Sequence, residues 1–319
     1  MSAWLPRAIG GVAPLAKPLR GTFGTLPFAD AYFELTGGVD RGRVAVLGGI
    51  SAGRHLTANQ LDESEGWWQA QCGYGRALDL EEYALLGVDF LGAHLRRGDQ
   101  VPRLDTRDQA RALAAVLDHL GIGRLEAIVG SSYGGMVALA FATLYPERVQ
   151  RLIVIGAAHE PHPMATAVRS IQRDIVRLAR AHGRPADGLD LARRLAMTTY
   201  RTAEEFAERF SNGQRVEDYL AHCGRRYVER FTAERFLCLS QSIDLHRVDP
   251  TAVTVPTTLV AIEGDAIAPP WQVQQLAAQL GERATLIQIR SHYGHDAFLK
   301  ETAAISRILQ QTLAEEVHA

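Results

Sequence analysis

The residues Gly130-Ser131-Ser132-Tyr133-Gly134 match the pattern G-x-S-x-G, with Ser132 at the centre. An apolar, strand-like segment, LEAIV, leads into them, and a helix-forming segment, GMVALAFATLYP, leads out. Glycines two positions before and after a serine permit the sharp strand-to-helix turn that exposes a nucleophile. The pattern therefore predicts Ser132 as a nucleophile, and Ser131 as a residue that packs or bonds locally. The alternative is a plain Gly/Ser turn.

A serine hydroxyl needs a base, and the base needs a group to orient it. Asp265 ends the apolar segment TTLVAIEGD, and His295 lies in the loop SHYGHDAF after the last apolar segment. The chain order serine, acid, histidine is the one that accompanies this turn. We expect His295 to take the Ser132 proton and return it, and Asp265 to orient the imidazole and stabilise its charged form.

Two nearby residues are rivals for these roles. His292 is a second possible base, although it lies closer to the end of the strand. Asp296 is a second possible acid, but a residue adjacent to the base cannot easily reach its far ring nitrogen. We therefore retain Ser132, Asp265 and His295 as the predicted catalytic residues.

A developing oxyanion needs backbone N–H groups that point at it. The N–H of Tyr133, at the start of the helix, is one candidate. The loop GGISAGRH supplies another, for which we expect Ile50, because Gly48 and Gly49 allow a close backbone approach. A simple glycine turn is the alternative for this loop.

The segments that must position these residues alternate between strand-like and helical patterns. Continuous apolar runs of this length are typical of strands buried on both faces of a parallel sheet. They are RVAVLGG, YALLGVDFLG, LEAIVG, VQRLIVIG, TTLVAIEGD and ATLIQIRS. Between the second and third, residues 106–120 predict a helix with a capping box of Thr106 and Gln109, which Gly121 ends. The order predicts an α/β fold, with a mostly parallel central sheet flanked by helices.

Residues 161–249 lack a strand-like run and carry Ala, Arg, Glu and Leu at helical spacing. We interpret them as a helical cap over the carboxyl edge of the sheet, inserted after the sixth strand. Residues 1–160 and 250–319 would then form the core.

The composition limits the classes of function. The chain has 319 residues, 47% of them hydrophobic, and a formal net charge of −2, so we expect neither nucleic acid nor a membrane surface as a partner. No apolar run approaches the roughly 20 residues that span a bilayer, and we do not interpret the N-terminus as a signal peptide. Three cysteines without CxxC spacing favour free thiols, no metal site and a cytoplasmic location.

From about Phe28 to Leu309 the chain resembles the homoserine O-acyltransferases of the α/β-hydrolase superfamily. The resemblance rests on the segment that begins GWWQAQCGYG, the nucleophile region LDHLGIGRLEAIVGSSYGGMVALAF and the loops GDAIAPPWQ and HYGHDAFL. It also rests on the cap segments AVRSIQRDIVRL, AMTTYRTAEEFAERF and RFLCLSQSIDLHRVD.

The resemblance implies an α/β-hydrolase fold and ping-pong transfer of an acetyl or succinyl group from acyl-CoA to L-homoserine, in methionine biosynthesis. It places the catalytic roles on Ser132, Asp265 and His295. It assigns the homoserine carboxylate to Arg201 and the ammonium to Asp296, as a zwitterion needs one cation and one anion. Acyl-CoA would be a co-substrate, with no permanently bound cofactor, and the protein would be a homodimer through its cap.

The chain departs from the family pattern in three places, one of which is a shortened polar stretch before the next helix, AHLRRGDQVPRLD. Tyr133 stands where Met usually follows the nucleophile, and Asp89–Phe90 replaces an Asn before LG. The changes leave the acyl donor open: Arg54, Arg96 and Arg97 are candidates to bind a succinyl carboxylate. Arg169, Arg173 and Arg177, four apart, either meet CoA phosphates or form a solvated face. A serine O-acyltransferase, a carboxylesterase or thioesterase, and a catalytically silent binding protein are the alternative functions.

Overall fold

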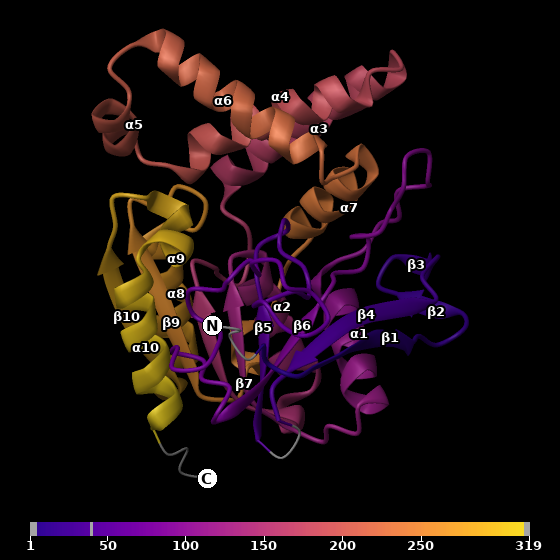
Figure 1. The fold of residues 1–319 in the computed structure, drawn as a ribbon, viewed down its shortest axis with the longest axis vertical. Helices are drawn as coiled ribbons and strands as arrows, with labels where there is room; N and C mark the ends of the chain where they lie inside the picture. The colour runs from indigo at the N-terminus through magenta and orange to yellow at the C-terminus, as the bar shows by residue number, and fades with distance from the viewer. Residues whose placement is uncertain (1–4, 39–40, 316–319) are drawn as a thin grey trace.

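The computed structural model describes residues 5–38 and 41–315. Its centre is a sheet of eight strands in the order β1-β4-β6-β5-β7-β8-β9-β10 (Figure 1). Strands β1 and β4 run antiparallel to their neighbours, and the remaining pairs are parallel. The bounds are β1 (Ala8–Pro14), β4 (Asp30–Thr36), β5 (Gly42–Leu47), β6 (Tyr83–Val88), β7 (Leu125–Ser131), β8 (Val149–Ile155), β9 (Thr257–Glu263) and β10 (Ala284–Arg290). The predicted α/β fold with a mostly parallel sheet is confirmed.

All six predicted strands are present as β5 to β10, whereas the sequence patterns did not indicate β1 and β4. Strand β1 is largely exposed and contains Gly10 and Gly11, so it lacks the continuous apolar run of the central strands. A separate hairpin, β2 (Leu19–Gly21) and β3 (Gly24–Leu26), lies between β1 and β4 in the chain.

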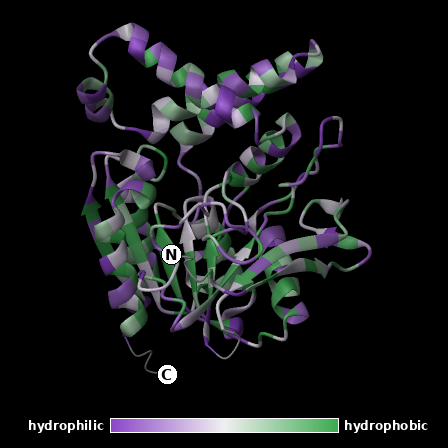
Figure 2. Cartoon of the chain, viewed as in Figure 1, coloured by the Kyte–Doolittle hydropathy of each residue, from purple (hydrophilic) through white to green (hydrophobic). Residues whose placement is uncertain are grey.

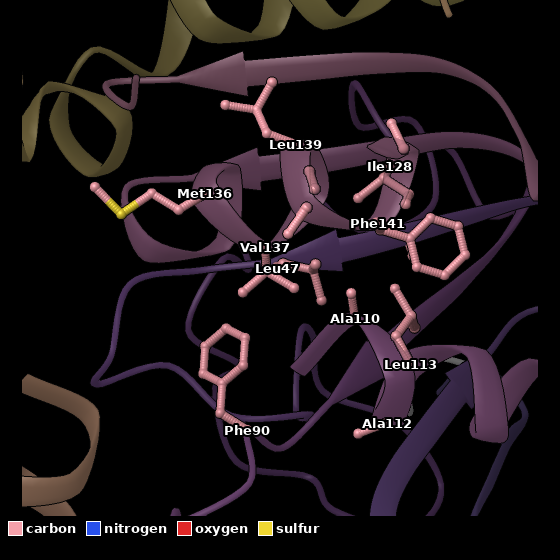
Figure 3. Packing of buried hydrophobic residues seen from close by; sticks show 14 of the residues in the cluster. Leu47, Phe90, Ala110, Ala112, Leu113, Ile128, Met136, Val137, Leu139 and Phe141 are labelled. Carbon is pink, nitrogen blue, oxygen red and sulfur yellow. The ribbon is translucent and has the colours of Figure 1, made fainter. Parts of the chain in front are cut away.

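The sheet is buried on both faces because successive residues of its central strands face opposite sides. In β7, Ile128 packs into one apolar cluster, and Ala127 and Val129 pack into the other. Figure 3 shows the first cluster, where Ile128 lies near Leu113 of α1 (Thr106–His119) and Phe141 of α2 (Tyr133–Leu144). This cluster also contains α8 (Pro270–Leu280). The second contains α9 (Ala297–Lys300) and α10 (Thr302–Ala314).

The start of α1 differs from the prediction in detail. Asp105 is the N-cap, and it forms the capping box with Asp108, so the predicted box of Thr106 and Gln109 is wrong. The Gln109 side chain instead accepts a hydrogen bond from the Leu91 N–H at 2.7 Å and donates one to the Leu91 carbonyl. An aspartate immediately upstream competes well for the cap position, because carboxylates accept strongly from free N–H groups.

Five helices lie between β8 and β9 in the chain, and β8 is the sixth strand of the sheet in chain order. They are α3 (Pro163–Ala181), α4 (Pro185–Tyr200), α5 (Ala203–Arg209), α6 (Gly213–Val228) and α7 (Ala233–Asp244), hereafter the cap helices. Figure 1 shows them over one end of the sheet. In Figure 2 they carry mixed hydrophilic and hydrophobic stretches, whereas the central strands are mainly hydrophobic. Their own apolar cluster includes Val176, Leu189 and Phe236.

The described residues also form four short 3-10 helices: η1 (Pro146–Arg148), η2 (Pro250–Ala252), η3 (Gly281–Arg283) and η4 (Gly294–Asp296). Across the described residues, no helix combines the length and apolar character needed to cross a membrane. Cys72, Cys223 and Cys238 are all free thiols.

Candidate active site

Ser132 occupies the turn between β7 and α2 in a strained backbone conformation. Its φ is 54° and its ψ is −121°, and it is the one non-glycine residue of the described chain with a positive φ. Such a conformation costs on the order of 1–3 kcal/mol and must be held by its surroundings. The Ser132 N–H donates to the Ile155 carbonyl at 2.8 Å, and the Gly134 N–H donates to the Gly48 carbonyl at 2.9 Å. These two bonds tie the turn to the ends of β8 and β5.

The glycines of the turn are required by close packing. A Cβ added to Gly130 would lie 2.4 Å from the Gly134 carbonyl oxygen, and one added to Gly134 would lie 2.2 Å from the Leu47 oxygen. Neither approach leaves space for a methyl group, so the flanking glycines of G-x-S-x-G follow from the geometry. Ser131 is fully buried, and its hydroxyl has no hydrogen-bond partner within the described chain.

The structure brings Ser132, His295 and Asp265 together in a linear arrangement. The Nε2 atom of His295 lies 2.8 Å from the Ser132 Oγ, and its Nδ1 lies 2.7 Å from the Asp265 Oδ2. The other Asp265 oxygen accepts hydrogen bonds from the N–H groups of Ile267 and Ala268, at 2.7 and 3.0 Å. Three residues from three strand ends therefore form one hydrogen-bonded chain, with its serine at a cavity.

Two opposing effects act on the pKa of His295. Burial of the ring lowers the pKa, because it disfavours the charged imidazolium. The carboxylate of Asp265, through its charge and its hydrogen bond, raises the pKa, and the charge of Asp296 adds to this. The carboxylates prevail, so the pKa of His295 lies above the ordinary histidine value.

The rival residues are placed elsewhere. The His292 ring pairs with Glu208, with Nε2 and the carboxylate oxygen 3.2 Å apart, and its carbonyl accepts a hydrogen bond from the Thr202 hydroxyl. Asp296 pairs with Arg201. Neither is part of the hydrogen-bonded chain that contains Ser132.

The two residues predicted for the oxyanion hole both line the cavity at Ser132. Tyr133 is the first residue of α2, so its N–H has no acceptor within the helix. Gly49 of the facing loop passes so near that a Cβ on it would lie 3.9 Å from the Ser132 Cβ. The Ile50 carbonyl accepts a hydrogen bond from the Arg235 guanidinium at 3.3 Å, which attaches this loop to α7.

Two adjoining cavities lie between the sheet and the cap helices. The inner cavity has a volume of about 200 Å³ and a mainly apolar lining, and Ile50, Ser132, Tyr133, Arg193, His295 and Asp296 are among its lining residues. The outer cavity, of about 570 Å³, is more open. The two cavities adjoin at the five residues that line both, which are Ser51, Trp67, Arg193, Asp296 and Leu299.

Arg201 and Asp296 lie together where the cavities meet. The Arg201 Nε and the Asp296 Oδ2 are 2.9 Å apart, and the Arg201 Nη1 donates to Glu205 at 3.2 Å. The Nε–H bond of Arg201 does not point at the Asp296 oxygen, so this buried donor has no hydrogen-bond acceptor within the described chain. Asp296 lines both cavities, whereas Arg201 lines only the outer one.

The structure contradicts both readings of Arg169 and Arg173, whereas Arg177 lies on a solvated face. Arg169 and Arg173 are buried and donate to the two oxygens of Asp244 on α7, at 2.7 and 2.6 Å. Helical spacing showed that they share a face, but the face is turned inward toward a carboxylate. Arg177 is exposed and pairs with Asp174.

The candidates for a succinyl carboxylate also lie away from Ser132. Arg54 pairs with Asp89 and does not line the inner cavity, and Arg96 and Arg97 are exposed.

Sequence reasoning missed Arg193, which lines both cavities. Its guanidinium lies 5.5 Å from the Tyr200 ring centre and 4.9 Å from that of Tyr227. The Tyr200 ring is in turn 5.9 Å from the His295 ring. Arg193 and Tyr200 are seven apart on α4, a spacing that places two residues on one helix face. This spacing could have identified Arg193 and Tyr200 if it had been known which face of α4 lines the cavity at Ser132.

In the part of the chain that is described, no cluster of three or more His, Cys, Asp or Glu side chains is placed to hold a metal ion.

Comparisons with known proteins agree with this arrangement. Residues 49–302 match the family model of the alpha/beta hydrolase fold. The homoserine O-succinyltransferase of Xanthomonas campestris pv. campestris is 46% identical over 88% of this chain and 78% of its own. The homoserine O-acetyltransferase of Thermus thermophilus is 34% identical over 91% of this chain and 87% of its own.

A solved structure with the same fold is the homoserine O-acetyltransferase from Bacillus anthracis. It superposes with a TM-score of 0.85 over 99% of this chain and all of its own, at 20% identity. The chain therefore belongs to the homoserine O-acyltransferase family of the α/β-hydrolase superfamily, and it is an enzyme of the acyltransferase class.

Proposed function

We propose that this protein transfers an acyl group from acyl-CoA to the hydroxyl of L-homoserine, a step of methionine biosynthesis. The observation that carries the proposal is the hydrogen-bonded chain Ser132–His295–Asp265 beside the Arg201–Asp296 pair. The 46% identity to a homoserine O-succinyltransferase favours succinyl as the acyl group. The other expected acceptor, L-serine, shares the amino and carboxylate groups and differs by one methylene.

In the first half of the reaction, Ser132 Oγ attacks the thioester carbonyl while its proton passes to His295 Nε2. The N–H groups of Tyr133 and Ile50 stabilise the oxyanion. The intermediate collapses with cleavage of the carbon–sulfur bond, and His295 returns the proton to the CoA sulfur. Asp265 holds the imidazole in the tautomer that accepts at Nε2.

In the second half, L-homoserine enters and its hydroxyl attacks the acyl-serine ester. His295 takes the hydroxyl proton, the ester bond to Ser132 breaks, and the proton returns to Ser132 Oγ. The carboxylate of homoserine binds Arg201, whose buried Nε–H has no hydrogen-bond acceptor among the described residues. Its ammonium binds Asp296, one residue after the base. Such positioning, together with the mainly apolar cavity, favours the hydroxyl over water.

The test is product analysis by mass spectrometry. The enzyme receives succinyl-CoA and acetyl-CoA in competition, with L-homoserine or L-serine as acceptor, and Ser132→Ala serves as the control. We expect O-succinylhomoserine as the main product of the unaltered enzyme and none from the variant. Release of free succinate or acetate without acylated amino acid would identify a thioesterase and overturn the proposal. A serine product in excess of the homoserine product would reassign the acceptor.

We further propose a homodimer through the cap helices. An exposed apolar stripe runs along α3, where a large apolar residue recurs every seven positions. Its members are Met164, Ile171 and Leu178, which are 65%, 55% and 65% exposed. Light scattering after size exclusion tests this: Ile171→Glu should yield monomers, and the exposed control Glu217→Gln on α6 should not. A monomeric unaltered protein at micromolar concentration would contradict the proposal.

A further inference from the structure

The outer cavity carries an excess of positive charge. Five cationic side chains line it, against two carboxylates, Glu65 and Asp296; the five are Arg193, Arg201, Arg226, Arg230 and Lys300. Arg201 is paired with Asp296 and Glu205, and the proposed function assigns it to the homoserine carboxylate. The other four form no ion pair with any residue that the structure describes, so their charges are available to a ligand.

These cations come from two sides of the cavity. Arg226 and Arg230 are four apart at the end of α6 and just beyond it, and Tyr219 and His222 of the same helix also line the cavity. Lys300 ends α9, which directly follows the loop of His295 and Asp296. Arg226, Arg230 and Lys300 are exposed. A ligand that extends outward from Ser132 therefore meets positive charge from α6 and from α9.

The neighbouring open cavity has the opposite character. It has a volume of about 990 Å³ and is lined by four carboxylates, Glu34, Asp62, Glu65 and Asp89. Two guanidinium groups also line it. That of Arg54 is already paired with Asp89, and that of Arg230 lies at the boundary with the outer cavity, because Arg230 lines both. Phosphate groups would be repelled by this lining and attracted by that of the outer cavity.

We propose that the outer cavity binds the phosphate groups of the acyl-CoA donor, through Arg226, Arg230 and Lys300, with Arg193 at the junction to the inner cavity. The proposal rests on the proposed acyl-CoA-dependent function, and it adds the place where the donor is held. Arginine and lysine bind phosphate oxygens through charge-assisted hydrogen bonds, which exceed neutral ones in strength. The thioester end would pass the shared residues Trp67 and Asp296 to reach Ser132.

The kinetic test compares two donors, succinyl-CoA and the succinyl thioester of N-acetylcysteamine, which has the same reacting bond but no phosphate. The variant is Arg226→Gln/Arg230→Gln. Its matched control is Arg225→Gln, an exposed neighbour on α6 that does not line the cavity. We expect kcat/KM for succinyl-CoA to fall about 10-fold in the double variant through a higher KM, and kcat/KM for the short thioester to stay within about twofold. Equal loss with both donors, or no loss, would overturn the proposal.

A binding measurement separates this proposal from the proposed function. Calorimetric titration with CoA and with pantetheine needs no turnover. We expect the double variant to bind CoA about 10-fold more weakly than the unaltered enzyme and to bind pantetheine equally. Unchanged CoA affinity would refute the phosphate site even if O-acylhomoserine forms. Absence of product from either thioester, with CoA binding lost in the double variant, would refute the proposed reaction and leave the site.

Discussion

The phenolic oxygen of Tyr133 lies 2.6 Å from the hydroxyl of Ser242, so the residue directly after the nucleophile is hydrogen-bonded to cap helix α7. The Tyr133 ring also meets Phe90 edge to face, with ring centres 4.8 Å apart. Tyr133 and Phe90 are both among the positions where the sequence departs from the pattern of the family that it resembles. Tyr133 and Phe90 therefore pack against each other, and Tyr133 joins the turn at Ser132 to α7.

Tyr133→Phe should lower the free energy of unfolding by about 1–2 kcal/mol, because it leaves the fully buried Ser242 hydroxyl without this partner. Ser242→Ala should have a similar effect. The double variant should be less unstable than the sum of the two, with a coupling energy of about 1 kcal/mol in urea denaturation. Strict additivity would show that the contact does not stabilise the protein.

The acid side of the pH–rate profile should report His295. Only the neutral imidazole can accept the Ser132 proton, so kcat/KM falls as the pH drops through the pKa of His295, which lies above the ordinary value of 6.5. Asp265→Asn removes the carboxylate that raises this pKa and leaves the burial that lowers it. In that variant the acid limb should move to lower pH, while the maximal rate falls by roughly 10⁴. A limb at the same pH in both enzymes would mean that another group controls it.

Arg201→Lys and Asp296→Asn should impair the second half of the reaction and spare the first. The KM for homoserine should rise by roughly 10- to 100-fold, because a single point charge replaces a fork and an amide replaces a carboxylate. The burst of CoA release in the absence of homoserine should keep its amplitude.

A matched control for Arg201 is Arg209→Gln. Arg209 also pairs with Glu205, at 3.1 Å, but lines neither the inner nor the outer cavity. It should therefore leave the KM for homoserine unchanged. A similar rise in KM in this control would indicate an indirect effect through Glu205.

His246 should make the protein less stable in acid. Its Nδ1 lies 2.7 Å from the Thr106 hydroxyl and its Nε2 lies 3.1 Å from the Ala158 carbonyl. Burial lowers its pKa from 6.5 to about 3. Below pH 6.5 the unfolded chain therefore binds a proton that the native state does not, and the free energy of unfolding falls as the pH decreases toward 3.

From this residue alone the loss at pH 5 relative to pH 8 is about 2 kcal/mol. His246→Gln should be less stable at pH 8 but should lose correspondingly less between pH 8 and 5, as measured by urea denaturation. The exposed His182→Gln should retain the pH dependence of the unaltered protein. An identical slope in His246→Gln would contradict the assignment.

The parallel strands of the central sheet could be predicted from the sequence, and so could the three hydrogen-bonded residues Ser132, His295 and Asp265. Both depend on short-range signals: buried parallel strands are continuous apolar runs, and the crowding at Gly130 and Gly134 requires glycine in the motif itself. The acid and the base were found because they follow strand ends, which a parallel sheet brings to one edge.

Contacts between distant segments could not be predicted in the same way. Arg169 and Arg173 were placed on one face by their spacing, but their partner Asp244 is 75 and 71 residues away, and only packing of α3 on α7 turns that face inward. Arg193 was missed for the same reason, since its role depends on which face of α4 meets the cavities. Strand β1 was not predicted because an exposed edge strand needs no apolar run.

Asp296 follows His295 directly in the chain and contacts Arg201, which lies between cap helices α4 and α5. In the proposed complex, an amino acid held by these three residues would be fixed at its carboxylate, its amine and its side-chain oxygen. Three points of attachment distinguish a molecule from its mirror image, so D-homoserine can satisfy two of them only by turning its oxygen away from the imidazole. These three contacts alone would therefore favour the L enantiomer of the substrate.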